Sequence, residues 1–108
     1  MMSARGDVTA IIGGEEVRLS LTLGAMAEIE RRLGVDSIGE VLAMVGRMSA
    51  RAILVMFEET AKAGGADIDA SKIDANEAFR ALTSLVEAAY PESSEEDQPA
   101  DGGAPVKN

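Results

Sequence analysis

The segment Thr22–Gly34, with the sequence TLGAMAEIERRLG, decides how the chain folds. The hydroxyl of Thr22 can accept a hydrogen bond from an unpaired backbone N–H at the start of a helix. Gly34 suits the left-handed conformation that commonly ends one. At helical spacing Glu28 and Arg32 fall on one side, and the apolar residues fall on the other: Leu23, Met26, Ile29 and Leu33. The pattern predicts an amphipathic helix on which the rest of the chain packs.

Upstream of this helix, residues 7–12 and 15–21 read as two strands. Gly13-Gly14 separates them, and two glycines form a tight turn that matches the twist of a β-hairpin. The register set by this turn leaves Ile11 on the polar face. The opposite face gathers Val8, Ala10, Ile12, Val17, Leu19 and Leu21. A lone hairpin is marginal in water, so we expect this apolar face to pack on helices or on another strand.

Three more helices are predicted downstream, over residues 37–48, 49–63 and 74–90. Each begins at a serine or an aspartate that can cap it, and in the first and last a glutamate three residues later completes a capping box. Pro91 ends the last helix. The sequence therefore predicts an α+β fold, in which a two-stranded β-hairpin precedes a bundle of about four α-helices.

The apolar faces of the last two predicted helices indicate which residues form the core. In residues 49–63, Met56 and Phe57 lie on the apolar side, whereas Val55 falls among charges. The charged residues of this helix are Arg51, Glu58, Glu59 and Lys62. In residues 74–90 an uninterrupted apolar arc places Phe79 and Leu82 in the core.

The chain is acidic, with a formal net charge of −9 over 108 residues. Residues 1–90 carry −5 and residues 91–108 carry −4. An acidic body without a basic patch argues against nucleic-acid binding and against docking on anionic membranes. Residues 91–108 have almost no apolar side chains, so we expect a disordered acidic tail after a single domain of residues 1–90.

The absence of cysteine and histidine limits the chemistry of the chain. It excludes disulfides, thiol nucleophiles, zinc sites of the usual type and imidazole catalysis. Gly13-Gly14 and Gly64-Gly65 read as a hairpin turn and a helix end, not as a nucleotide-binding loop. We expect no catalytic residues, no metal, no cofactor and no small-molecule substrate. No run of apolar residues has the length of a signal peptide or a membrane span, so a cytoplasmic location is expected.

Four residues are candidates for a partner-binding surface because they lie at or beyond the edges of the apolar stripes: Met44, Met48, Val55 and Met56. Methionine side chains suit sequence-tolerant apolar contacts. Ordinary core packing and self-association are the alternatives for these residues. The edge of the hairpin is a rival surface, since unpaired strand N–H and C=O groups can recruit another chain.

Three motifs stand close together near the N-terminus: Gly6-Asp7-Val8, LTLGAMAEIE at 21–30 and GVDSI at 34–38. With the glycine turn, they resemble the N-terminal signature of the small tail protein family of gene transfer agents and related phages. The resemblance is firmest over residues 5–40. Met26 and Ile29 stand where that family usually has leucine, a substitution that conserves side-chain volume.

The resemblance implies a protein from a phage-tail gene cluster, either a tail-tube protein or a tail assembly chaperone, and it brings no catalytic residues. We favour a chaperone that covers apolar helical stretches of the tape-measure protein, because two strands cannot build the β-sandwich of a tube subunit. The alternative is a structural tail component that stays in the particle. Whether the cluster makes a phage or a domesticated gene transfer agent is open.

Overall fold

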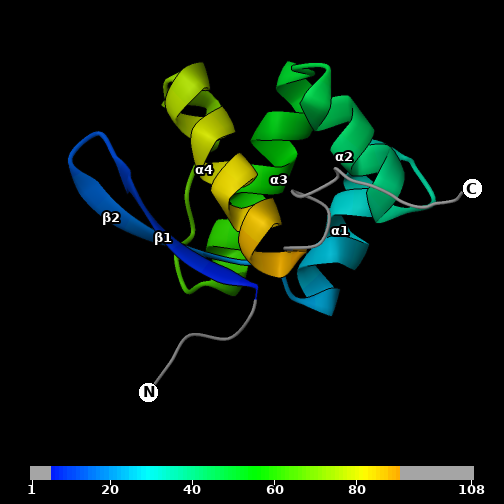
Figure 1. Cartoon of the computed structure of the whole chain (residues 1–108), viewed down its shortest axis with the longest axis horizontal. Helices are drawn as coiled ribbons and strands as arrows, with labels where there is room; N and C mark the ends of the chain where they lie inside the picture. The colour runs from blue at the N-terminus through cyan, green and yellow to red at the C-terminus, as the bar shows by residue number, and fades with distance from the viewer. Residues whose placement is uncertain (1–5, 91–108) are drawn as a thin grey trace, which may run out of the picture.

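The computed structural model describes residues 6–90, in which an antiparallel hairpin precedes the helices (Figure 1). The elements are β1 (Asp7–Ile12), β2 (Glu15–Ser20), α1 (Leu23–Leu33), α2 (Ile38–Gly46), α3 (Ala50–Ala63), the short 3-10 helix η1 (Ala70–Lys72) and α4 (Ala75–Ala89). The predicted α+β fold, with a hairpin and four α-helices, is confirmed. The segment 91–108, expected to be a disordered tail, lies outside the described residues.

The hairpin has the predicted register, with Val8 opposite Leu19. Both turn residues have positive φ, 58° at Gly13 and 86° at Gly14, which glycine adopts without steric cost. Ile11 is exposed on the polar face, as predicted. The apolar face packs on the helices, because β1 contacts α4 and β2 contacts α3.

Side chains cap the helices at the predicted positions. Thr22 Oγ1 accepts a hydrogen bond of 3.0 Å from a backbone N–H of α1, and Ser37, Ser49 and Asp74 cap α2, α3 and α4 in the same way. Gly34 ends α1 with a left-handed φ of 70°. These local signals explain why the helices begin where the sequence indicates.

The buried stripe of α1 is centred on Ile29, which is completely buried. Ala25 and Leu33 lie one turn away on either side of it and are also buried. Leu23 was predicted on this stripe, but it is 80% exposed. It lies six positions before Ile29, which puts it about 120° around the helix from the centre of the stripe.

The α2 helix ends at Gly46, two residues before the predicted end. Met48 has a φ of 63° and occupies the left-handed position that follows the helix. The N–H of Met48 donates to Val45 O at 2.9 Å, and the N–H of Ser49 donates to Met44 O at 3.0 Å. This is the Schellman arrangement, in which glycine is the usual left-handed residue. Met48 is therefore removed from the apolar stripe of α2, and its side chain is 46% exposed.

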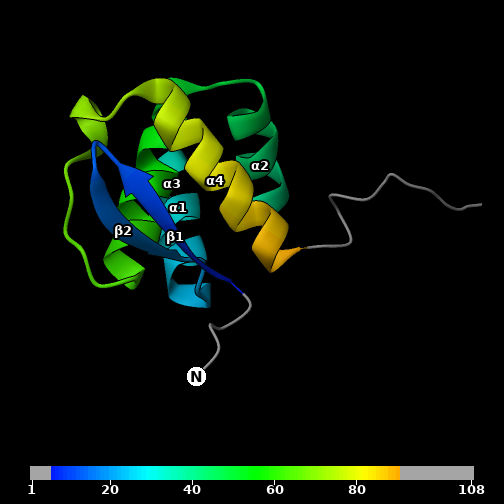
Figure 2. The ribbon, with the colours of Figure 1, turned by 60° about the vertical axis from the view of Figure 1, so that its left-hand side comes forward.

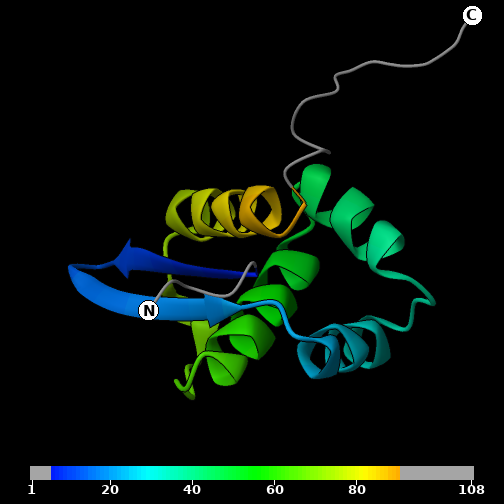
Figure 3. The ribbon, with the colours of Figure 1, turned by 60° about the horizontal axis from the view of Figure 1, so that its bottom comes forward.

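The α3 helix lies at the centre of the structure and contacts α1, α2, α4, β2 and η1 (Figures 2 and 3). Glu59 was predicted on the charged side of α3 with Arg51, Glu58 and Lys62. This prediction is wrong for Glu59, because the residue is only 6% exposed. Because five elements surround α3, little of its circumference is open to solvent. Its buried residues are Ala52, Ile53, Val55, Met56, Phe57, Glu59, Thr60 and Ala61.

A glycine at the end of α3 allows the hairpin to approach. A Cβ atom at Gly64 would overlap the carbonyl group of Arg18 on β2. The φ of Gly64 is −84°, so the need for glycine here comes from space and not from backbone conformation. The close contact seats the hairpin on the end of α3.

Candidate functional site

An apolar groove lies between α2 and α4, with a volume of about 260 Å³. Both helices pack on α3, and within residues 6–90 they do not pack closely on each other. Figure 3 shows α4 and α2 above α3, with the end of α4 next to α2. The groove is lined by Leu42, Val45, Gly46, Phe79, Leu82, Thr83, Val86, Glu87 and Tyr90.

The α4 wall of the groove follows from the spacing of its apolar residues. Apolar residues recur here at intervals of three or four positions, which places them along one face of the helix and of its C-cap residue Tyr90. They are Phe79, Leu82, Val86 and Tyr90. A second apolar stripe of α4 packs inward and contains Ala78, Ala81, Leu82 and Leu85, all buried. The apolar arc of α4 is therefore wider than the surface that α3 and β1 cover, and the remainder faces the groove.

Burial differs between the floor and the walls of the groove. Leu82 is fully buried and Val45 is 6% exposed, so these two form the floor. The walls are half-buried side chains: Leu42, Phe79, Val86 and Tyr90. The prediction that Leu82 is a core residue is confirmed, whereas Phe79 lies on a groove wall and not within the core.

Gly46 leaves an opening on the α2 side. Among the residues that the structure describes, no heavy atom outside the local helix backbone lies within 4 Å of a Cβ atom built at Gly46. The position has an ordinary helical backbone, since Gly46 is not among the glycines with positive φ. Glycine at this position therefore keeps the groove open, and neither the fold nor the backbone conformation requires it.

The predicted partner-binding residues are not brought together. Met48 is exposed and Met44 is half-buried, but Val55 is 4% exposed and Met56 is fully buried. The expectation that Val55 and Met56 lie on an accessible surface is wrong, because α3 is enclosed by its neighbours. None of the four lines the groove. The groove residues were missed because helical periodicity identifies apolar faces without identifying what covers them.

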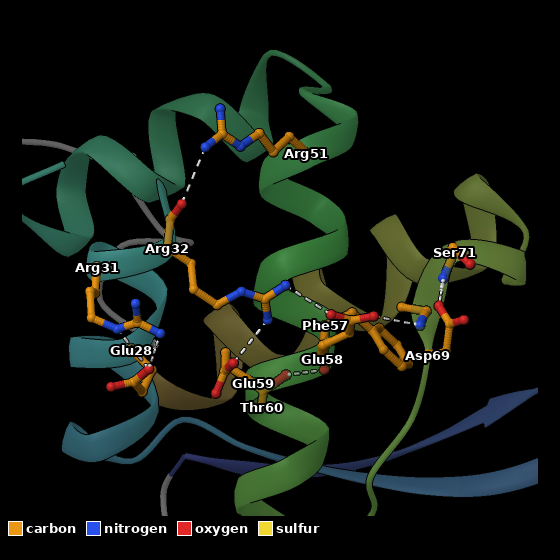
Figure 4. A network of polar contacts seen from close by, with 11 residues as sticks. Glu28, Arg31, Arg32, Arg51, Phe57, Glu58, Glu59, Thr60, Asp69 and Ser71 are labelled. Atoms are coloured by element: carbon orange, nitrogen blue, oxygen red, sulfur yellow. Dashed lines mark hydrogen bonds and ion pairs between the residues drawn. The ribbon is translucent and has the colours of Figure 1, made fainter. Parts of the chain in front are cut away.

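A second hollow, of about 280 Å³, is polar. Its lining residues are Arg32, Glu58, Glu59, Lys62, Asp67, Ile68 and Asp69. Arg32 reaches from α1 to α3, where Nη1 donates to Glu59 Oε2 at 2.9 Å and Nη2 donates to Glu58 Oε1 at 3.0 Å (Figure 4). The other oxygen of Glu58, Oε2, accepts a hydrogen bond of 2.8 Å from the N–H of Ala70 in η1.

These contacts give the polar hollow a structural role. The hydrogen bond that Arg32 donates to Glu59 is charge-assisted, and it raises the pKa of the Arg32 guanidinium above its usual value. Through Glu58 and Glu59 the cluster ties α1 and η1 to the central helix. Among residues 6–90, no three histidine, cysteine or acidic side chains are grouped so as to hold a metal ion. The part of the chain that the structure describes also has no helix with the length and apolarity needed to cross a bilayer.

Comparison with known proteins identifies the family to which the chain belongs. No curated protein and no solved structure gives a significant match. The profile of the family described as "Phage tail tube protein, GTA-gp10" matches residues 5–91. The match spans the hairpin and all four α-helices, and so extends well beyond the N-terminal motifs. The resemblance to tail proteins of gene transfer agents and phages is confirmed, and the chain belongs to the phage tail tube protein family GTA-gp10.

Proposed function

We propose that this chain is a tail assembly chaperone, a non-enzymatic protein that covers apolar helical stretches of the tape-measure protein until the tail tube forms around it. The observation that carries the proposal is the α2–α4 groove. It leaves apolar side chains of the folded chain open to a partner, and grooves between helices commonly receive the apolar face of another helix.

Two further features support a non-enzymatic chaperone, the first over a tube subunit and the second over an enzyme. The described residues form one two-stranded sheet, whereas a tube built from packed β-sheets needs more strands from each subunit. The charged groups of the polar hollow that would be candidates for chemistry, Arg32, Glu58 and Glu59, are engaged with one another. A chaperone acts in the bacterial cytoplasm beside its partner and is absent from the finished particle.

A structural tail component is the second candidate, and the family description, tail tube protein, favours it. Such a component stays in the particle in a fixed ratio to the other tail proteins. Mass spectrometry of purified particles separates the two candidates, because the chaperone is expected in the cell lysate and not in the particles. Its presence in stoichiometric amount in the particles would overturn the chaperone proposal.

Co-expression with the tape-measure protein of the same gene cluster tests the chaperone directly. We expect the tape-measure protein to become soluble and to elute with this chain on gel filtration. The substitution Val86→Lys in the groove should abolish the complex, because it places a charge on an apolar wall. Ile11→Lys is the matched control, since Ile11 is an apolar residue 60% exposed on the hairpin.

The outcomes of this experiment are distinct. Equal solubility of the tape-measure protein without this chain would refute the chaperone proposal. Loss of the complex with Ile11→Lys alone would move the binding surface to the hairpin.

Met48, which is exposed, and Met44 are proposed to contact the partner from the C-terminal end of α2.

A further inference from the structure

We infer that the groove between α2 and α4 receives a cationic amphipathic helix from the partner, oriented with a lysine or arginine beside Glu87. The inference rests on the proposed function for the identity of the partner chain. It goes further in specifying the secondary structure, the apolar spacing and the charge of the segment that binds.

The geometry favours a helix as the occupant. The apolar residues that face the groove extend from Phe79 of α4 to Tyr90, the C-cap residue of this helix, over about 16 Å or three turns. The opposite wall is another helix, α2, so the occupant packs on two helices at once. Apolar side chains of the occupant at intervals of three and four residues would match the spacing along α4.

The open position at Gly46 adds a specific feature. Because no described atom outside the local helix lies within 4 Å of a Cβ built at this residue, a large side chain of the occupant fits over it. Insertion of one side chain into a space between helices is the usual form of close helix packing. Gly46 therefore marks where a leucine or phenylalanine of the partner is received.

The charge of the occupant follows from the groove and from the chain as a whole. Glu87 is the charged residue among those that line the groove. The chain carries a net charge of −9. A lysine or arginine beside Glu87 forms an ion pair at the rim, and the acidic protein attracts a basic segment during encounter.

The same charges disfavour two other occupants. A second copy would bring another net charge of −9 to the same surface. The segment 91–108 follows Tyr90 in the sequence, but it contains five acidic residues and one lysine. Either occupant would add negative charge close to Glu87, and like charges in contact weaken association.

Two labelled peptides test the inference on the intact chain. Both are helices of about 15 residues with leucines at the spacing of the α4 stripe, one flanked by lysine and the other by glutamate. By fluorescence anisotropy we expect the lysine peptide to bind and the glutamate peptide to bind at least about tenfold more weakly. Equal binding of the two peptides would overturn the charge assignment.

Charge reversal locates the contact. Glu87→Lys should weaken binding of the lysine peptide by about tenfold and strengthen that of the glutamate peptide. Glu16→Lys changes the net charge equally at an exposed position of the hairpin, and it should leave the ratio of the two affinities almost unchanged. If both variants have the same effect, the attraction is a general property of an acidic protein and Glu87 has no special role.

Filling the groove tests its occupancy without unfolding the protein. The Cβ atom of Gly46→Leu has space in the free chain and the rest of the side chain would lie in the groove, so we expect an unchanged or higher melting temperature together with loss of peptide binding. Ala27→Leu adds a similar apolar side chain at an exposed site on α1 and should bind the peptide normally. Undiminished peptide binding by a folded Gly46→Leu variant would overturn the groove as the site.

Retention of the tape-measure protein by the native chain and by the Gly46→Leu variant distinguishes failure of this inference from failure of the proposed function. If Gly46→Leu still holds the tape-measure protein in solution, the chaperone proposal stands and the groove is not its site. If the native chain binds the lysine peptide through the groove but does not retain the tape-measure protein, the site stands and the proposed function fails.

Discussion

Arg32 of α1 donates a hydrogen bond of 2.9 Å to Glu59 of α3, although the Glu59 side chain is only 8% exposed. A buried carboxylate without a partner is strongly unfavourable, so the pair holds the two helices in one relative position. The interaction joins residues 27 positions apart and helps to define the tertiary arrangement.

The first prediction is that Arg32→Ala lowers the free energy of unfolding by about 2 kcal/mol, because it leaves the Glu59 carboxylate buried and unpaired. Urea denaturation followed by circular dichroism measures the change. Arg31→Ala is the control, since Arg31 pairs with Glu28 on the exposed face of the same helix and should have little effect. Equal stability of the Arg32→Ala variant and the native chain would show that the ion pair is not a tertiary lock.

The second prediction concerns the left-handed residue after α2. Met48→Gly should raise the free energy of unfolding by about 0.5–1 kcal/mol, because glycine adopts a φ of 63° without steric strain. Arg47→Gly, one residue earlier with a φ of −86°, should instead lower stability, since no strain is relieved and the unfolded chain gains entropy. A lower thermal midpoint for Met48→Gly would contradict the assignment of strain.

The third prediction compares two glycines at the C-terminal ends of helices, whose substitution should have opposite effects. Gly64→Ala should cost about 2–3 kcal/mol, because the added methyl group overlaps the backbone of Arg18. Gly46→Ala should add about 0.5–1 kcal/mol, because the methyl group has open space and alanine favours the helix. Parallel thermal melts of the two variants measure the difference, and changes of the same sign would contradict this account.

The fourth prediction is a pH dependence centred on Asp7. Its two carboxylate oxygens accept hydrogen bonds of 2.6 Å from Ser20 and Arg18, and these contacts, led by that from Ser20, lower the pKa of Asp7 below its usual value. The stabilisation is complete above the pKa of the unfolded state, near 3.8, and is lost as the pH falls through the lower folded value.

Asp7→Asn should therefore be less stable than the native chain by about 1 kcal/mol at pH 7. The difference should begin to diminish as the pH falls below about 4, because the Asp7 carboxylate is then protonated in the unfolded state while it stays ionised in the folded state. Denaturant midpoints of both proteins between pH 7 and pH 3 measure this difference in stability. A difference that stays constant over this range would show that the Asp7 charge does not contribute to stability.

The features predicted from the sequence are those with local causes. The turn at Gly13-Gly14 requires positive φ, and the hydroxyls of Thr22 and Ser37 need only a backbone N–H three residues away. Neighbouring residues are enough to specify these structures. The hairpin register and the helix starts could therefore be predicted before any tertiary contact was known.

The features that were missed depend on which elements meet. Glu59 reads as a surface charge until Arg32, 27 residues earlier, is placed beside it. Val55 reads as exposed until α3 is surrounded by other elements. The groove arises because α2 and α4 pack on α3 at separate places, and the periodicity of either helix gives no information on the distance between them.

The anchoring of α2 has a consequence for the range of segments that the groove can receive. This helix is nine residues long, buries Val41 and Val45, and contacts α1 and α3, whereas α4 is fifteen residues long and is held by both β1 and α3. The short wall is therefore the one that local fluctuations displace most easily. We therefore expect a bulkier or slimmer helix to displace α2, while α4 keeps its position. For the proposed chaperone, a groove of adjustable width would suit recognition of successive, non-identical stretches along a single long polypeptide.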